Sequence, residues 1–342
     1  MSDRTPNSSV QSFPNGSSAA APETAEALAL PDLPYEEWSD TLDTLHLFAQ
    51  IVGKVKLAAT HPQNHWWNVT FSVDARGLTT RRLYTHGIFF DIAFDFVDHR
   101  LVVRTDRGET RAFPLDGGLS VAQFDRTLHG TLAELGVDVP LLEHPFGVPH
   151  LTTPFADDTE HRAYRRDFVE RYWRALGWSA DVFQEFMGWF TGKVSPVHVF
   201  WHSFDLATAR FSGKRAAPRA GADPVTAEAY THEVVSFGWW PGDPKVRHAS
   251  YYSYTAPQPE GLAAHPLSPP QAAWVDDGAM AVLPYDAVRT DAEPRRALLA
   301  FLQTAFDAGS RAAHWPADEL TSTWCPTSDQ LRALSRAGLS RH

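Results

Sequence analysis

The sequence predicts an α+β protein made of two similar halves, each a largely antiparallel β-sheet flanked by helices. Apolar residues at helical spacing come first, then a series of short stretches with alternating apolar residues, then helical spacing again. This order occurs twice in the 342 residues. A chain of this length also exceeds the usual size of one domain, which favours two halves.

The first half is expected at residues 33–142. A helical pattern follows Ser39, a candidate N-cap, and continues to about Ala59. Ser120 and Gln123 form a candidate capping box for a second helix before residue 142. Between these helices, five stretches predict antiparallel strands joined by short turns: WWNVTFSV, GLTTRRLY, IFFDIAFDFV, RLVVRT and ETRAFPL.

The second half is expected at residues 155–315 and repeats this order. Its pattern predicts one helix that ends near Gly177 and another that Ser179 caps. Five further strands are predicted at VHVFWHSFDL, THEVVSFGWW, ASYYSYT, AAWV and AMAVLPY, with a turn at Asp276-Asp277-Gly278 between the last two.

A closing helix is expected after Thr290 and Glu293, which form a second candidate capping box, with Pro294 in its first turn. Residues 1–32 are expected to be a disordered tail and residues 316–342 a C-terminal extension. The linker near Leu142–Pro154 would then join the two halves, with a cleft where they meet.

An internal duplication would explain the shared order. The first predicted strands of the two sheets have the same spacing of histidine and apolar residues, which pairs His65, Trp67, Phe71 and Val73 with His198, Phe200, Phe204 and Leu206. Any two aromatic strands share this much, so the order of elements is the firmer argument.

Composition excludes several classes of protein. The formal net charge of -11 and the absence of a clustered basic surface argue against nucleic-acid binding. No apolar run approaches the roughly 18 residues of a membrane span, and the first thirty residues lack a signal sequence, so we expect a soluble cytoplasmic protein. The single cysteine, Cys325, excludes an internal disulfide framework and is expected to be an idle thiol.

The segment SPVHVFWHSFDLATAR, residues 195–210, is the most informative part of the chain. If it is extended, His198 and His202 lie on one face of a strand, about 13 Å apart. Zinc binds histidine nitrogen at about 2 Å, so this spacing argues against a shared ion, and we expect no metal site. A single imidazole at His202 with Asp205 or Glu233 is instead a candidate for general acid–base catalysis. The alternative is that these histidines lie in an aromatic core with their ring nitrogens hydrogen-bonded.

Aromatic residues and histidines also suggest a binding pocket. The polar loop before Trp67, and the SFGWWPGD and ASYYSYT segments, supply flat side chains on which a ring or sugar can stack. The alternative is that the loop before Trp67 is a turn whose tryptophans begin the core, and that the other two segments are strands with one face in the core. The candidate ligand-binding residues are His65, Trp67, His198, Trp201, His232, Trp239, Trp240 and Tyr252.

Familiar catalytic motifs are missing. The chain has neither a nucleotide phosphate loop, nor a G-x-G-x-x-G turn, nor a G-x-S-x-G motif. The segment HEVVS begins like a zinc-protease motif but lacks its second histidine.

Several longer motifs resemble a bacterial family known only as a domain of unknown function. They include LPYEEW, VHVFWHSFDLATARFSG, SFGWWPGD and YYSYTAPQPEGL, and the resemblance covers roughly Leu33 to Trp315. It implies a single unit with a dispensable tail and transfers neither an activity nor a cofactor.

These observations leave three hypotheses. The first is a protein that binds a small molecule in an aromatic, histidine-lined pocket between its halves. The second is an enzyme that uses His202 with a carboxylate, with or without a divalent metal. The third is a scaffold whose aromatic surface meets another protein. The sequence leaves the cofactor and the oligomeric state unknown.

Overall fold

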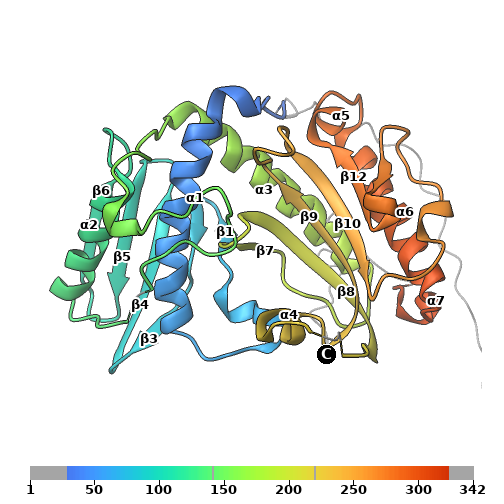
Figure 1. Cartoon of the computed structure of the whole chain (residues 1–342), viewed down its shortest axis with the longest axis horizontal. Helices are drawn as coiled ribbons and strands as arrows, with labels where there is room; N and C mark the ends of the chain where they lie inside the picture. Colours follow the sequence, from blue (N-terminus) through green and yellow to red (C-terminus); the bar gives the residue numbers. More distant parts are fainter. Residues whose placement is uncertain (1–28, 141, 219–220, 323–342) are drawn as a thin grey trace, which may run out of the picture.

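The computed structural model describes residues 29–140, 142–218 and 221–322, and it confirms two antiparallel sheets flanked by helices (Figure 1). The first half begins with helix α1 (Tyr35–Ala58) and the 3-10 helix η1 (Asn64–Val69) and ends with helix α2 (Val121–Glu134). Its strands are β1 (Ser72–Asp74), β2 (Gly77–Thr79), β3 (Leu83–Thr85), β4 (Ile88–Asp95), β5 (Arg100–Thr105) and β6 (Thr110–Pro114).

The second half begins with helix α3 (Arg166–Gly188) and ends with α5 (Tyr285–Arg289), α6 (Pro294–Ala312) and α7 (Ala317–Leu320). Its strands are β7 (His198–Phe200), β8 (Asp205–Arg215), β9 (His232–Trp240), β10 (Ser250–Ala256), β11 (Ala273–Val275) and β12 (Met280–Pro284), with the short helix α4 (Pro224–Ala229) between β8 and β9. The remaining 3-10 helices are η2 (Phe155–Asp157), η3 (Leu262–Ala264) and η4 (Asp276–Gly278), of which η4 is the expected turn.

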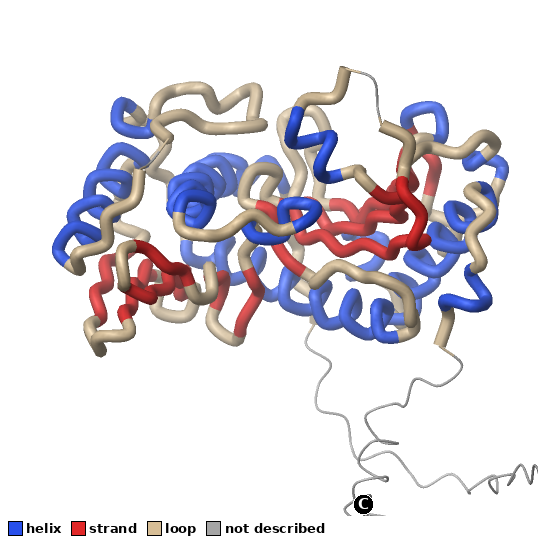
Figure 2. Tube along the Cα trace, turned by 90° about the horizontal axis from the view of Figure 1, so that it is seen from below, coloured by secondary structure: helices blue, strands red, loops and turns tan. Residues whose placement is uncertain are grey.

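In both sheets, most neighbouring strands are also consecutive in the sequence. The first has the order β1-β2-β4-β5-β6, with β3 paired to β4, and the second has the order β11-β12-β10-β9-β8-β7. Helices α3 and α6 pack against β8, β9 and β10. Helix α1 lies over the strands of the first sheet in Figure 1, and the tube in Figure 2 shows the sheets as separate groups of strands.

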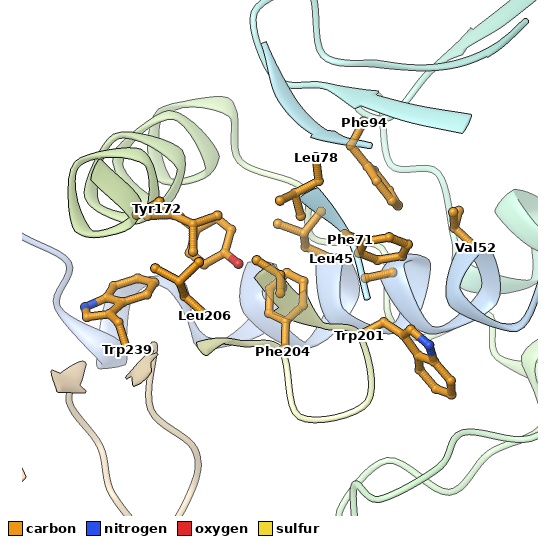
Figure 3. Packing of buried hydrophobic residues seen from close by; sticks show 14 of the residues in the cluster. Leu45, Val52, Phe71, Leu78, Phe94, Tyr172, Trp201, Phe204, Leu206 and Trp239 are labelled. Atoms are coloured by element: carbon orange, nitrogen blue, oxygen red, sulfur yellow. The ribbon is translucent and has the colours of Figure 1, made fainter. Parts of the chain in front are cut away.

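The two halves share one hydrophobic core. Phe71 and Val199 exchange backbone hydrogen bonds of 2.8 and 2.9 Å, which join the start of the first sheet to β7. The ring of Phe71 lies edge-on to Phe94 of the first sheet at 6.1 Å between centroids. Figure 3 shows Phe71 and Leu45 between Phe94 on one side and Phe204 on the other. The cleft between the halves is therefore closed by side chains near α1, and any cavity must lie to one side of this contact.

Two predicted strands are wrong, and both errors concern the candidate site. Residues 64–69 form η1 rather than a strand, because His65 and Trp66 take left-handed φ angles of 56° and 61°. VHVFWHSFDL is a hairpin: β7 ends at Phe200, residues 201–204 turn, and β8 starts at Asp205. The proposed alignment of these two segments therefore fails, and the 13 Å argument for His198 and His202 does not apply.

The predicted helix boundaries also need correction. Helix α1 starts at Tyr35 rather than after Ser39. Helix α3 continues through Gly177, and Ser179 forms a 2.9 Å hydrogen bond with the Tyr251 hydroxyl instead of capping a helix. A buried face that packs against β8 outweighs the weak helix propensity of one glycine.

One of the two predicted capping boxes is confirmed and the other is wrong. The Ser120–Gln123 capping box of α2 is present with both of its hydrogen bonds. At α6, Glu293 is the N-cap without a side-chain capping bond, so the capping box expected with Thr290 is wrong, whereas Pro294 does occupy the first turn.

Candidate functional site

A cavity of about 570 Å³ lies against one face of the second sheet, where the two halves meet. Its walls come from α1, η1, the loop that contains Phe146, the turn between β7 and β8, and helix α4. Strands β8, β9 and β10 form its floor, and alternate residues of β8 face it: Asp205, Ala207, Ala209 and Phe211. Seven of the predicted site residues line it: His65, Trp67, His198, Trp201, His202, Asp205 and Tyr252.

Asp205 anchors the polar part of the floor. Its side chain is buried, and each carboxylate oxygen accepts a hydrogen bond, one from the Ser203 hydroxyl and one from the Tyr252 hydroxyl. Tyr252 reaches it from β10 across β9, where its backbone neighbour is Gly238. A Cβ at Gly238 would lie 2.2 Å from Cζ of Tyr252, so only glycine leaves room for this ring.

A second pair of phenols lies beside Asp205. The hydroxyls of Tyr230 and Tyr254 are 2.9 Å apart, and the rings of Tyr254 and Tyr252 are stacked at 6.1 Å between centroids. Both Tyr230 and Tyr254 line the cavity. The floor is thus aromatic, with hydroxyl groups that a ligand can contact.

His202 lies in the β7–β8 turn beside Asp205. Burial lowers the pKa of its imidazole, and the charge of Asp205 acts in the opposite direction. Within the described residues, neither ring nitrogen has a hydrogen-bond partner. A neutral imidazole that lines a cavity with both nitrogens unused can donate to or accept from a bound molecule.

The backbone around His202 is fixed by α1. The Nε2 atom of His46 lies 3.1 Å from the carbonyl oxygen of Trp201 and 3.2 Å from that of His202. Gln50 forms two hydrogen bonds with the backbone of Phe146, one to its carbonyl at 2.9 Å and one from its amide at 2.8 Å. These contacts from one helix hold the turn beside the Phe146 loop, and the rings of Phe146 and His202 are 6.1 Å apart between centroids.

His198 faces the cavity in one defined tautomer. The Thr70 hydroxyl donates to the carbonyl oxygen of Trp67 at 3.0 Å and lies 3.2 Å from Nδ1 of His198. Because a hydroxyl has one hydrogen, Nδ1 must donate to Thr70, which leaves Nε2 as an acceptor. Burial, with a smaller contribution from the charge of Lys56, lowers the pKa of His198 to about 3. The ring is therefore neutral at pH 7.

One cation also lines the cavity. Lys54 of α1 is 5% exposed, and its Nζ lies 5.6 Å from the ring centroid of Trp201 and 5.9 Å from that of Phe155. The indole of Trp201 lies directly against α1 at Gly53, where a Cβ would be 2.2 Å from its ring. Glycine at this position brings the lysine and the indole together.

His65 and Trp66 tie η1 to helix α4. Nδ1 of His65 lies 2.8 Å from the carbonyl oxygen of Ala229, and Nε1 of Trp66 donates to that of Val225 at 3.1 Å. Lys193 Nζ lies 2.7 Å from Nε2 of His65, so this nitrogen accepts and Nδ1 donates. The left-handed backbone of His65 and Trp66 directs both rings to the ends of α4.

Four of the predicted site residues lie outside the cavity lining. Trp239 is fully buried on the other face of the sheet, 5.7 Å from the ring of Tyr172. Trp240 ends β9, and Glu233 accepts a 2.8 Å hydrogen bond from Ser212. His232 contacts the site only through the ring of His65, 5.7 Å away. Strand alternation accounts for Trp239, because it places adjacent residues on opposite faces.

Sequence reasoning missed several lining residues, of which Lys54, Phe146 and Tyr254 matter most. Lys54 had a detectable signal, since it lies three residues after Ile51 on the apolar stripe of α1. Phe146 lies in the expected linker and had none.

Within the described residues, no group of three or more histidines, cysteines or acids is placed to hold a metal ion. Cys325 lies outside these residues. The helices found in the same part of the chain are all too short or too polar to cross a membrane.

Comparisons with known proteins assign the chain to a family but give it no activity. A family model described as "Family of unknown function (DUF5996)" matches residues 30–322, which confirms the resemblance to an uncharacterised family. No curated protein and no solved structure gave a significant match.

Proposed function

We propose that this chain, which belongs to the DUF5996 family of unknown function, binds a small molecule in the cavity between its two halves. One observation carries the proposal: aromatic walls enclose polar groups whose hydrogen-bonding capacity is unused, above all His202. Small-molecule sites typically combine mostly apolar walls with a few convergent polar groups. We retain the sequence-based expectation of a cytoplasmic protein that acts without nucleic acid.

The size and mouth of the cavity support this function. Its volume of about 570 Å³ falls within the roughly 300–1,000 Å³ of typical ligand pockets. Leu142, Phe146 and Val225 line it and are 62%, 50% and 38% exposed. Apolar side chains exposed at the rim of a polar-centred cavity favour a ligand with an apolar body.

Two walls of the cavity are also fixed before any ligand binds. His46 and Gln50 fix the turn and the Phe146 loop through backbone hydrogen bonds. A site fixed before binding loses little conformational entropy when the ligand enters. These contacts favour a binding site over a surface that forms only against another protein.

Thermal-shift screening against a panel of metabolites tests the proposal, because a ligand that prefers the native state raises its melting temperature. The Ala209→Phe variant fills the cavity from β8 and is expected to lose the shift. Ala93→Phe, on the partly exposed face of β4, adds the same ring away from the cavity and is expected to keep it. If no compound stabilises the protein, or if Ala209→Phe responds like the parent chain, the proposal is wrong.

Proton transfer by His202 is the second candidate function. A neutral imidazole without a partner beside the Asp205 carboxylate favours it, since a general base needs an available nitrogen and an orienting charge nearby. Mass spectrometry of stabilising compounds after incubation would detect turnover. Conversion by the parent chain and none by His202→Gln is the expected result for an enzyme, and unchanged compounds in both contradict it.

A further inference from the structure

We infer that the ligand carries an oxyanion, a carboxylate or a phosphate, that binds Lys54 within the cavity while its aromatic or apolar body lies between the rings of the walls. The inference rests on the proposed function and specifies the class of ligand.

The first argument is that Lys54 has no counter-ion. Its side chain is 95% buried and lines the cavity, yet Nζ forms neither a hydrogen bond nor an ion pair with any described residue. Among the described residues, the rings of Trp201 and Phe155 lie near its charge. A buried ammonium is costly unless it is paired, so an open position beside Nζ suits an anion.

The second argument comes from the neighbouring lysines, whose hydrogen bonds are made within the protein. Lys56, two residues along α1, donates to the carbonyl oxygens of Thr70 and Thr80, the second at 2.8 Å. Lys193 donates to His65. The fold therefore satisfies two buried or half-buried lysines around the cavity and leaves Lys54 open toward it.

The third argument is that Asp205 does not act as the missing counter-ion. Its oxygens accept from Ser203 and Tyr252, and it takes part in no ion pair among the described residues. Burial, rather than any nearby acid, governs the pKa of Lys54 and lowers it. An anion bound at Nζ would supply the stabilisation that the protein itself does not.

The surroundings of Lys54 define the rest of the ligand. Trp201 and Phe146 also line the cavity, and their rings are 6.5 Å apart between centroids. A flat apolar body can pack against these side chains while its anionic group reaches Nζ. An oxyanion accepts hydrogen bonds from an ammonium in either the carboxylate or the phosphate form.

Calorimetric titration with four probes that share one ring system tests the inference: indole-3-acetate, its neutral analogue indole-3-acetamide, the cation tryptamine, and indoxyl phosphate. We expect one or both anions to bind at least about tenfold more tightly than the amide, as is typical of a hydrogen bond to a charged group. The stronger of the two anions distinguishes a carboxylate ligand from a phosphate ligand. Tryptamine is expected to bind most weakly.

Three variants assign the effect to Lys54. Lys54→Met is expected to abolish the preference for the anion over the amide, and Lys54→Arg to restore most of it. Lys245→Met removes an exposed charge far along the chain and controls for net charge, so it should keep the preference. The first two variants also show whether loss of binding reflects loss of folding, because Lys54→Arg retains the buried charge.

The outcomes separate this inference from the proposed function. Binding of all probes with equal affinity, or an anion preference that survives in Lys54→Met, overturns the inference and leaves the binding cavity intact. If no probe binds and the metabolite panel gives no stabiliser, both are wrong.

Discussion

The Tyr252 hydroxyl donates a hydrogen bond to Asp205 across the full width of strand β9, over Gly238. Three adjacent strands thus cooperate to hold one buried carboxylate in the floor of the cavity. Because Asp205 is buried, the hydrogen bonds from Tyr252 and Ser203 replace those that water would otherwise donate to its side chain. This arrangement makes the carboxylate a fixed part of the site.

Removing the Tyr252 hydroxyl is expected to destabilise the protein. In Tyr252→Phe, Asp205 loses one of its two side-chain donors, and hydrogen bonds to charged groups contribute about 1.5–3 kcal/mol. Urea denaturation should show a decrease of this size in the free energy of unfolding. Tyr84→Phe, at an exposed tyrosine of β3, is the matched control and should change it little. An equal effect of the two variants would mean that the Asp205 contact carries no stability.

Adding a methyl group at Gly238 is expected to break the same contact sterically. The new Cβ would overlap the Tyr252 ring, and overpacking typically costs about 1–3 kcal/mol. In a Tyr252→Ala background, where the ring is absent, Gly238→Ala should cost much less. A double-mutant cycle by denaturation measures this difference. Additive effects of the two changes would contradict the proposed steric relationship.

Stability is expected to fall as the pH drops below about 6.5, the ordinary pKa of histidine. Burial lowers the pKa of His46 to about 4 and that of His198 to about 3, so both rings stay neutral in the folded state while they take up protons in the unfolded chain. Because the unfolded chain then binds more protons than the folded protein, the free energy of unfolding should fall by about 2 kcal/mol for each ring by pH 5.

Denaturation at several pH values checks this dependence. Between pH 6.5 and 5, the slope of the unfolding free energy against pH measures how many more protons the unfolded chain binds than the folded protein. His198→Gln should reduce this number by about one. His129→Gln is the control of opposite sign, because the hydrogen bond with Asp125 raises the pKa of His129 and so favours the folded state in acid. A slope that His198→Gln leaves unchanged would show that His198 takes up its proton equally in the folded and unfolded states, which contradicts a pKa lowered by burial.

Replacing Arg210 is expected to stabilise the protein. This residue of β8 is 2% exposed on the face away from the cavity, with its guanidinium 3.6 Å from the ring centroid of Phe186. Burial lowers its pKa to about 9, while the charge of Asp307 acts in the opposite direction. The guanidinium also donates a hydrogen bond to the Phe186 carbonyl, but its Nε has no partner among the described residues. Arg210→Met should raise the free energy of unfolding by about 1–4 kcal/mol.

The control for this prediction is Arg104→Met, at an exposed arginine paired with Asp91. It should lower stability by no more than about 1 kcal/mol, as is usual for surface ion pairs. A decrease for Arg210→Met larger than that of the control would show that the aromatic contacts compensate for burial of the charge.

The parts of the fold that could be predicted are those with a strong local pattern. The alternation of apolar residues identified β4, and the Ser120–Gln123 spacing identified the start of α2. The β7–β8 hairpin could not be found because residues 201–204 contain no glycine, proline or asparagine. Phe204 takes a φ of 56° there, an unfavourable conformation for a bulky residue, and burial of its ring in the shared core offsets the cost.

The candidate site was predictable in part for a related reason. Histidine and tryptophan stand out in a sequence, and five such candidates meet at the cavity together with Tyr252 and Asp205. Lysine in a helix is normally exposed, so Lys54 was not predicted to line a buried site. Its role depends on Gly53 and Trp201, which are 148 positions apart in the chain and meet only when the two halves pack.

The most direct test of the binding cavity is a two-dimensional NMR spectrum of the tryptophan indole N–H groups, recorded with and without a stabilising ligand and assigned by Trp→Phe variants. The account predicts that the signals of Trp66, Trp67 and Trp201, which line the cavity, shift on binding. Those of Trp38 and Trp315, which are buried elsewhere, should remain in place. Shifts confined to Trp38 and Trp315, or no shift of the three cavity indoles at saturation, would contradict it.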